Sequence, residues 1–199
     1  IDPIRYISNK SSGKQGYEIA SQLVLSGAKV ILISGPTNID PPPNLKFIKI
    51  KSAIEMYNEI KKTSNFDIGI FTAAVSDFKN KKMNRTKIKK NNNNLNISFI
   101  NNIDILKKVG ENKKQRPKYL VGFAAETGGV NYAKKKLVDK NCDMIIYNKI
   151  NNKNKVFESD YNKISIVTNN QTINFKKMTK INCAKAIIKN ISINITNNE

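Results

Sequence analysis

The chain contains no histidine and no tryptophan, and only two of its 199 residues are cysteine. Without histidine it cannot form a Ser-His-Asp triad or a Cys-His pair, and it has no imidazole to bind zinc or transfer protons. Cys142 and Cys183 lie far apart, outside any CxxC motif, so we expect neither a cysteine metal site nor a disulfide framework. Both are expected to be small buried side chains in a reducing cytoplasm. An enzyme built from this sequence would work by holding charge and positioning groups.

Long apolar runs are also missing. No stretch is apolar enough to span a bilayer, and the N-terminus lacks a signal-peptide pattern, so we expect a cytoplasmic protein without a membrane partner. The chain has neither GxGxxG after a strand nor GxxxxGK followed by Ser or Thr, which argues against a nicotinamide oxidoreductase and a P-loop protein. It begins with Ile1 rather than Met, and we interpret it as a piece of a longer polypeptide.

Acidic residues are scarce: 35 Lys and Arg oppose 15 Asp and Glu, which gives a net charge of +20. Such a balance invites a nucleic-acid-binding interpretation. Proteins that read nucleic acid favour Arg and stacking aromatics, however, and here nearly every base is a Lys. The heavy use of Lys, Asn and Ile is typical of an A/T-biased genome. We keep a nucleic-acid-binding module as an alternative and do not expect nucleic acid to be the main partner. The only arginines are Arg5, Arg85 and Arg116.

The chain does contain a regular alternation of strand and helix patterns. Its 199 residues are 39% hydrophobic, which suits one α/β domain. Strands separated by helices and short links favour a Rossmann-like fold, a mostly parallel sheet with helices on both faces. A small C-terminal β-hairpin and a helix over residues 181–191 follow, with a frayed tail from Ser192. Strands are predicted at 29–34, 47–50, 67–72, 119–123 and 144–147, and the hairpin at 163–167 and 172–175.

A polar segment ahead of the first helix is a candidate anion site. Ser11 and Ser12 are expected to cap the helix whose apolar positions begin at Ile19, while Gly13 and Gly16 let a ligand approach the backbone. The unpaired N–H groups of a helix start can hold a phosphate or a carboxylate, although many ordinary helices begin in this way. Three basic side chains could add charge there: Arg5, Lys10 and Lys14.

The other candidates lie in loops and on a later helix. Ligands of parallel sheets bind beyond the carboxyl ends of the strands, so we expect the loops after Ser34, Thr72 and Val121 to converge on one crevice. Residues 79–94 are dense in Lys and Asn and form either a flap whose lysines meet a polyphosphate or a solvated linker. Lys136 and Lys140 share a predicted helix face and either bind phosphate or face solvent.

Short motifs follow one another in a set order: 1–9 (Ile-Asp-Pro-Ile-Arg-Tyr-Ile-Ser-Asn), 11–14 (Ser-Ser-Gly-Lys), 34–37 (Ser-Gly-Pro-Thr), 73–78 (Ala-Ala-Val-Ser-Asp-Phe), 87–90 (Lys-Ile-Lys-Lys), 102–105 (Asn-Ile-Asp-Ile) and 122–127 (Gly-Phe-Ala-Ala-Glu-Thr). Together they resemble phosphopantothenate–cysteine ligase, the synthetase half of the bifunctional bacterial coenzyme A protein. The resemblance covers essentially the whole chain and implies one ligase domain over residues 1–199. That family carries a strand and a Gly/Thr-rich turn before the Ile-Asp-Pro segment, so we expect this domain to lack its first strand.

The resemblance implies a two-step reaction with Mg²⁺ present. The carboxylate of 4'-phosphopantothenate attacks the α-phosphate of CTP, which gives an acyl-cytidylate and pyrophosphate. The amine of L-cysteine then attacks the acyl carbon, which gives 4'-phosphopantothenoylcysteine and CMP. The resemblance also implies a homodimer and the use of CTP rather than ATP. FMN is expected only where a phosphopantothenoylcysteine decarboxylase is fused to the ligase, and not in this chain.

The resemblance also assigns residues by motif. Asn9 corresponds to the residue that holds the acyl-nucleotide for the cysteine step, and Lys87 to a catalytic lysine on the flap. Arg5 would pair with an anionic group beside Asn9, and Ala74 would border the pantothenate. No residue is implied as a metal ligand. The nucleotide contacts implied are Phe71, Thr72, Ala73, Asp77, Lys87, Asn102, Ile103, Asp104, Ile105, Phe123, Lys136 and Lys140. A non-catalytic nucleotide-binding domain stays open as the alternative function.

Overall fold

The computed structural model describes the chain apart from residues 10, 64, 91–93, 151–158 and 197–199. Lys10 of the predicted anion site and residues 91–93 of the predicted flap therefore lie outside the described residues. Among the described helices, none combines the length and the hydropathy needed to cross a membrane.

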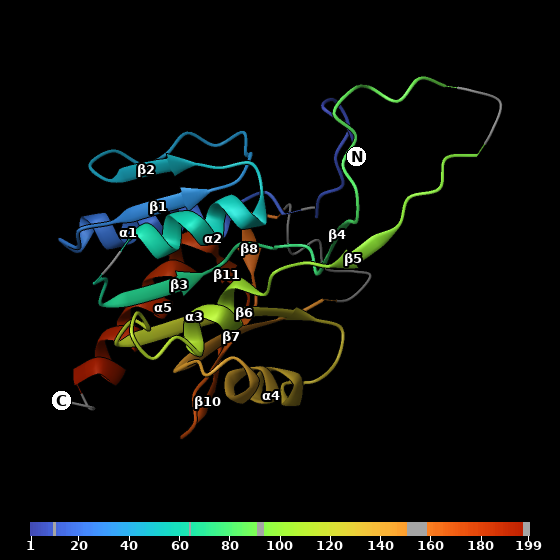
Figure 1. Ribbon diagram of the computed structural model, residues 1–199. Helices are drawn as coiled ribbons and strands as arrows, with labels where there is room; N and C mark the ends of the chain where they lie inside the picture. Colours follow the sequence, from blue (N-terminus) through green and yellow to red (C-terminus); the bar gives the residue numbers. More distant parts are fainter. Residues whose placement is uncertain (10, 64, 91–93, 151–158, 197–199) are drawn as a thin grey trace.

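The central element is a five-stranded sheet in the order β10-β9-β7-β6-β3 (Figure 1). Three strands run parallel, and two C-terminal strands add an antiparallel hairpin in which Ile173 lies opposite Ile166, as predicted. A parallel pair, β1 (Ile31–Ser34) and β2 (Lys46–Lys49), forms a separate sheet. This mixed α/β architecture confirms the predicted fold class, whereas the missing first strand stays a prediction. The central strands are β3 (Ile68–Phe71), β6 (Tyr119–Glu126), β7 (Met144–Lys149), β9 (Ile164–Val167) and β10 (Thr172–Asn174).

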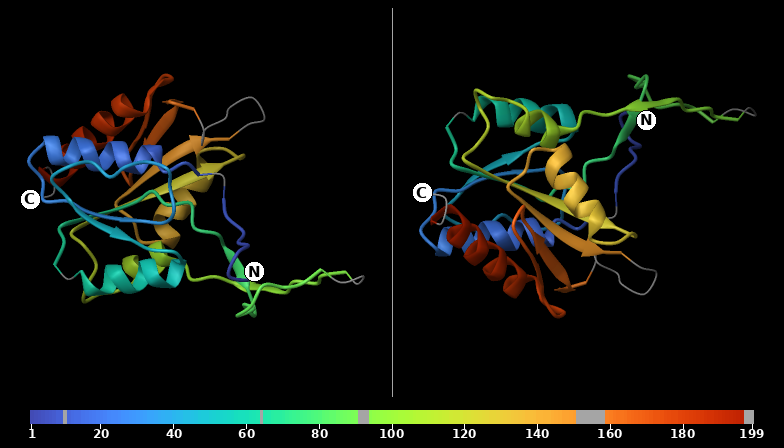
Figure 2. Two further views of the ribbon diagram at one scale, coloured as in Figure 1. Left: turned by 90° about the horizontal axis from the view of Figure 1, so that it is seen from above. Right: turned by 90° about the horizontal axis from the view of Figure 1, so that it is seen from below.

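Helices cover both faces of the central sheet (Figure 2). Two of them pack on one face, over a core cluster that contains Cys183. The other face carries three helices and a second cluster that contains Cys142. Burial raises the pKa of the Cys142 thiol to about 12 and that of Cys183 to about 11, so both are inert apolar side chains. The first pair is α1 (Lys14–Leu25) and α5 (Lys180–Thr196); the other three are α2 (Ala53–Lys62), α3 (Ile105–Gly110) and α4 (Asn131–Asp139).

The structure corrects several predicted boundaries. The N-cap of helix α1 is Gly13, whose φ of 78° is left-handed, rather than Ser11 or Ser12, and the Ser12 hydroxyl accepts from the Lys14 N–H at 3.5 Å. Strand β6 continues to Glu126, so the loop that was expected after Val121 begins later. Helix α5 runs to Thr196, so the predicted fraying from Ser192 is wrong over its described part.

The described part of the predicted flap belongs to an arm, residues 78–90 and 94–101, that projects from the body of the molecule (Figure 1). Its base is an antiparallel pair of strands, β4 (Phe78–Asn80) and β5 (Phe99–Asn101). The sequence of residues 95–99 has a strand-like pattern, but only Phe99 of these residues belongs to β5. A second short pair not foreseen in the sequence joins β8 (Tyr161–Asn162) to β11 (Met178–Thr179).

Candidate functional site

The first turn of α1 lies between the loops that follow β1 and β3. A Cβ atom added to Gly13 would lie 2.8 Å from Cγ2 of Thr37, and one added to Gly16 would lie 2.6 Å from Oγ1 of Thr72. The close approach explains why small residues occupy both positions. The Lys14 N–H donates to the Ser12 hydroxyl at 3.5 Å, and the N-cap Gly13 has no side chain to accept from the rest of the turn. Among the described residues no side chain accepts from the Gln15 or Gly16 N–H groups, so this turn suits an anionic group.

A chain of hydroxyl groups fixes the helix to the end of β1. The Tyr17 hydroxyl donates to Oγ of Ser34 at 3.1 Å and accepts from the Thr37 hydroxyl at 3.0 Å. Tyr17 and Ser34 are both buried. Two of the three loops that were expected to converge thus meet at the start of α1.

Asn9 reaches the same region from the N-terminal segment, residues 1–9. Its Nδ2 donates to the carbonyl oxygen of Ala74 at 2.6 Å, across 65 residues of sequence. Ala74 lies two residues beyond Thr72, which contacts the first turn of α1. The structure therefore brings Asn9, Thr72 and Ala74 together, and Ala73 lies between the last two.

A second group of predicted residues surrounds the start of α3. The backbone N–H of Asn102 donates to the Asp77 carbonyl at 2.7 Å, and the Asn102 carboxamide oxygen accepts from the Ile103 N–H at 2.9 Å. The Asp104 side chain caps α3 and forms an ion pair with Lys140. Burial pushes the pKa of Asp104 up, but the Lys140 ammonium and a backbone N–H outweigh it, so the pKa is lowered.

The residues of this second group contact one another. Lys140, expected on the phosphates, is paired with the Asp104 carboxylate. Ile105 is buried in the core below α2, α3 and α4, with Phe71 packed against it, which makes both structural as well as candidate residues. The charge of Lys136 also acts on Asp104.

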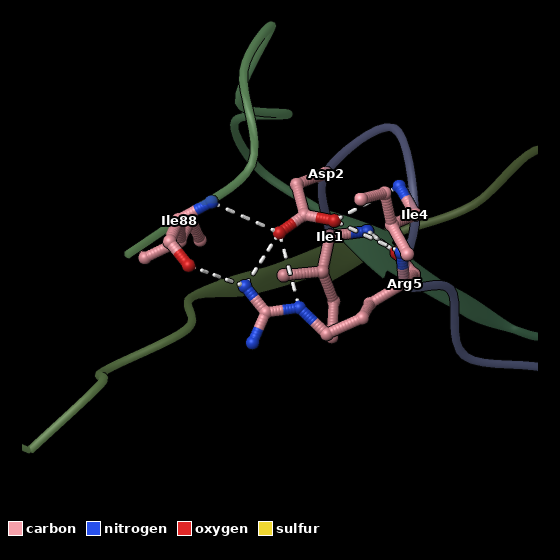
Figure 3. A network of polar contacts seen from close by, with 5 residues as sticks. All are labelled: Ile1, Asp2, Ile4, Arg5 and Ile88. Atoms are coloured by element: carbon pink, nitrogen blue, oxygen red, sulfur yellow. Dashed lines mark hydrogen bonds and ion pairs between the residues drawn. The ribbon is translucent and has the colours of Figure 1, made fainter. Parts of the chain in front are cut away.

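Three predicted residues lie apart from both groups. Phe123 packs against the cluster beneath α1 and α5, on the sheet face opposite α4, which carries Lys136. Lys87 is exposed on the arm. Arg5 does pair with a carboxylate, but that carboxylate is Asp2 of its own segment, at 2.5 Å (Figure 3).

One buried side chain at the carboxyl edge was missed in the sequence. Asn148 lies near the end of β7 opposite Ala125 of β6, and only 7% of it is exposed. Its Oδ1 has no hydrogen-bond partner among the residues that the structure describes. A buried unpaired acceptor is costly, so this position suits a donor group of a ligand. The available signal was a polar residue directly after the apolar run 144–147.

Known proteins resemble this chain over most of its length. A family model described as the DNA/pantothenate metabolism flavoprotein C-terminal domain matches residues 1–194. The coenzyme A biosynthesis bifunctional protein CoaBC of Borreliella burgdorferi is 44% identical over 193 residues, which cover 95% of this chain and 48% of that protein. CoaBC of Bacillus subtilis is 43% identical over 169 residues, which cover 83% and 41%. The chain thus spans about half the length of these curated relatives.

A solved structure supports the same relationship. The crystal structure of the C-terminal domain of CoaBC matches with a TM-score of 0.81 and 36% identity, over 99% of this chain and 90% of that one. The family match and the structural match cover the same region, including the N-terminal segment, the arm and α1. This chain belongs to the family of DNA/pantothenate metabolism flavoprotein C-terminal domains.

Proposed function

We propose that this domain is a CTP-dependent phosphopantothenate–cysteine ligase of coenzyme A biosynthesis. A carboxylate oxygen of 4'-phosphopantothenate attacks the α-phosphorus of CTP, and the bond to pyrophosphate breaks. The amine of L-cysteine then attacks the acyl carbon, loses a proton and displaces CMP. The names of the CoaBC relatives support the pathway, and the motif resemblance supports this half-reaction for the present chain.

The observation that carries the proposal is the hydrogen bond from Asn9 to the Ala74 carbonyl. It joins the residue assigned to the acyl-nucleotide to the residue assigned to the pantothenate, beside the first turn of α1 with its Gln15 and Gly16 N–H groups. A helix start next to a carboxamide can hold an anionic substrate and an acyl group at once. This contact links positions from two motifs that are far apart in the sequence.

The chemistry fits a chain without histidine. A substrate carboxylate is already ionised at neutral pH and needs no base, so the protein has to align the reactants and stabilise phosphate charge. We assign charge stabilisation to Lys87, Lys136 and Lys140 and alignment to Asn9. Lys140 would exchange its Asp104 partner for a phosphate oxygen.

Magnesium fits as an ion that arrives with the nucleotide. The described residues contain no group of three or more Asp, Glu or Cys side chains that could cage a metal. Mg²⁺ is commonly held by phosphates and one or two carboxylates, and we propose that the phosphates of CTP carry it into the site. When bound, Mg²⁺ neutralises charge on the phosphates. FMN has no role in this chain under the proposal.

We further propose that the domain works as a homodimer. Large apolar side chains are exposed on the arm and beside it in the N-terminal segment, and a second copy would cover them. Light scattering should give the mass of a dimer, and a monomer alone would contradict this part. These exposed side chains are Ile4, Tyr6, Ile7, Phe78, Met83, Leu95, Phe99 and Ile100.

The test is a pyrophosphate-release assay with 4'-phosphopantothenate, L-cysteine, CTP and Mg²⁺. The ligase should release pyrophosphate and form 4'-phosphopantothenoylcysteine, and ATP in place of CTP should give a slower reaction. Nucleotide binding without pyrophosphate release would instead identify a non-catalytic nucleotide-binding domain. Matched reactions without 4'-phosphopantothenate control for simple CTP hydrolysis.

A further inference from the structure

The Asp2 carboxylate accepts five hydrogen bonds, from Ile4, Arg5 and Ile88. Its side chain is fully covered, with 0% exposed. Oδ1 accepts from the backbone N–H of Ile4 at 3.0 Å and of Arg5 at 2.9 Å. Oδ2 accepts from Nε of Arg5 at 3.0 Å, from Nη2 of Arg5 at 2.5 Å and from the N–H of Ile88 at 3.2 Å (Figure 3).

Ile88 belongs to the arm, and both its N–H and its carbonyl group form hydrogen bonds to the N-terminal segment. Its N–H donates to Asp2 across 86 residues of sequence, and its carbonyl accepts from Nη2 of Arg5 at 3.1 Å. The N–H of Asn84 adds a third bond, to the Ile1 carbonyl at 3.2 Å. These bonds lie beyond the β4–β5 pairing, whose ladder extends outward to the bond from the Lys81 N–H to the Ser98 carbonyl.

The N-terminal segment is thereby anchored at both ends. Asp2 and Arg5 fix one end to the arm, and Asn9 fixes the other to Ala74 at the carboxyl edge of the sheet. Lys87 directly precedes Ile88, so the peptide group that donates to Asp2 also sets the position of the Lys87 backbone.

We propose that Asp2 is a positioning residue: together with Arg5 it forms a clasp that fastens residues 84–90 of the arm to the N-terminal segment and so sets Lys87 relative to Asn9. Only a carboxylate suits this place, because both oxygens face donors. An asparagine would turn its NH₂ group toward at least one set of them. The Arg5 guanidinium holds the pKa of Asp2 well below its usual range, so the clasp is closed at neutral pH.

The first test measures amide hydrogen exchange at Ile88 by NMR in the 199-residue chain. Asp2→Asn should speed this exchange at least tenfold, while the amide of Val121 in the central sheet stays unchanged. Asp40→Asn, which changes an exposed carboxylate on another loop, is the matched control and should leave Ile88 unchanged. Exchange at Ile88 within twofold of wild type in Asp2→Asn would overturn the clasp.

A second variant covers the case in which Asp2→Asn does not fold. Arg5→Met keeps the carboxylate but removes the bond to the Ile88 carbonyl, and it should also speed exchange at Ile88 at least tenfold. Unchanged exchange in Arg5→Met would overturn the clasp in the same way. This readout needs no substrate and is independent of the proposed ligase activity.

The action through Lys87 rests on the proposed function and has its own test. The rate of pyrophosphate release is compared in Asp2→Asn, Lys87→Gln and the double variant. If Asp2 acts by positioning Lys87, the double variant should be no more than about twofold slower than Lys87→Gln. If the fold-losses in rate of the two single variants multiply in the double variant, Asp2 does not act by positioning Lys87. A wild-type chain without activity would overturn the ligase proposal and leave the exchange result standing.

Discussion

Substituting Gly16 tests the packing between α1 and the loop after β3. An added Cβ would lie 2.6 Å from Oγ1 of Thr72 and 3.6 Å from its Cβ. The first distance is far shorter than a van der Waals contact, and the second is an ordinary van der Waals contact. Gly16→Ala therefore forces the Thr72 hydroxyl to rotate away, and the rest of that side chain can stay in place.

The size of the effect follows from two opposing contributions. Alanine in place of glycine within a helix stabilises by about 1 kcal/mol. Moving Thr72 off its preferred rotamer costs about 0.5–1.5 kcal/mol. The two nearly cancel in the wild-type background. In a Thr72→Ala background the obstacle is gone, so Gly16→Ala should there show its full stabilisation, and the two substitutions should be coupled by about 1 kcal/mol.

Urea unfolding of the four proteins of this cycle measures the coupling. Gly129→Ala is the control, because no described atom lies within 4 Å of a Cβ added there, and it should not couple to Thr72→Ala. Equal stabilisation by Gly16→Ala in both backgrounds would show that the Thr72 hydroxyl does not oppose a methyl group at position 16. If Thr72 contacts the nucleotide, Gly16→Ala should also raise KM for CTP about tenfold, as the loss of a hydrogen bond to a charged group does.

Gly110→Ala places a Cβ 2.0 Å from the Lys140 carbonyl oxygen, so it should cost about 1–3 kcal/mol and lower Tm by several degrees; an unchanged melting curve would contradict this. Lys87→Gln should slow acyl-cytidylate formation in a rapid-quench assay, and a normal rate in that half-reaction would refute the role of the flap lysine. Because the pKa of Asp2 is lowered, its bonds should persist above about pH 4 and fail as the pH falls toward the lowered pKa. Protection of the Ile88 amide, measured against pH, should follow that course, and its loss between pH 7 and 5 would contradict it.

Local patterns in the sequence predicted the elements that are stabilised locally. Ser52, followed three residues later by Glu55, has the pattern of a helix start, and it caps α2 by accepting from the Glu55 N–H at 3.3 Å while the Glu55 carboxylate accepts from the Lys51 N–H at 2.8 Å. Alternating apolar residues identified the C-terminal hairpin, and apolar runs identified β6 and β7. These signals need no knowledge of distant contacts.

Other features depend on contacts that no local pattern contains. Gly13 rather than a serine caps α1 because the chain turns there with a left-handed backbone close to Thr37. The arm strands lie in a stretch dominated by Lys and Asn, and β4 is paired only because β5 returns beside it. The Asp2–Ile88 contact joins segments that the sequence gives no reason to connect. For the candidate site, the motif order supplied the candidate residues, while the pairing of Lys140 with Asp104 required the structure.

The role of Asn9 in holding the acyl-cytidylate is tested most directly with the Asn9→Asp variant. The variant is mixed with 4'-phosphopantothenate, CTP, Mg²⁺ and L-cysteine, the reaction is quenched, and the acyl-cytidylate is measured by chromatography. Asn9 donates through Nδ2 to Ala74, and an aspartate would replace that donor with a charged acceptor. We expect the variant to release pyrophosphate and to accumulate the acyl-cytidylate, without forming 4'-phosphopantothenoylcysteine. Formation of 4'-phosphopantothenoylcysteine at the wild-type rate would contradict the role of Asn9 at the start of α1.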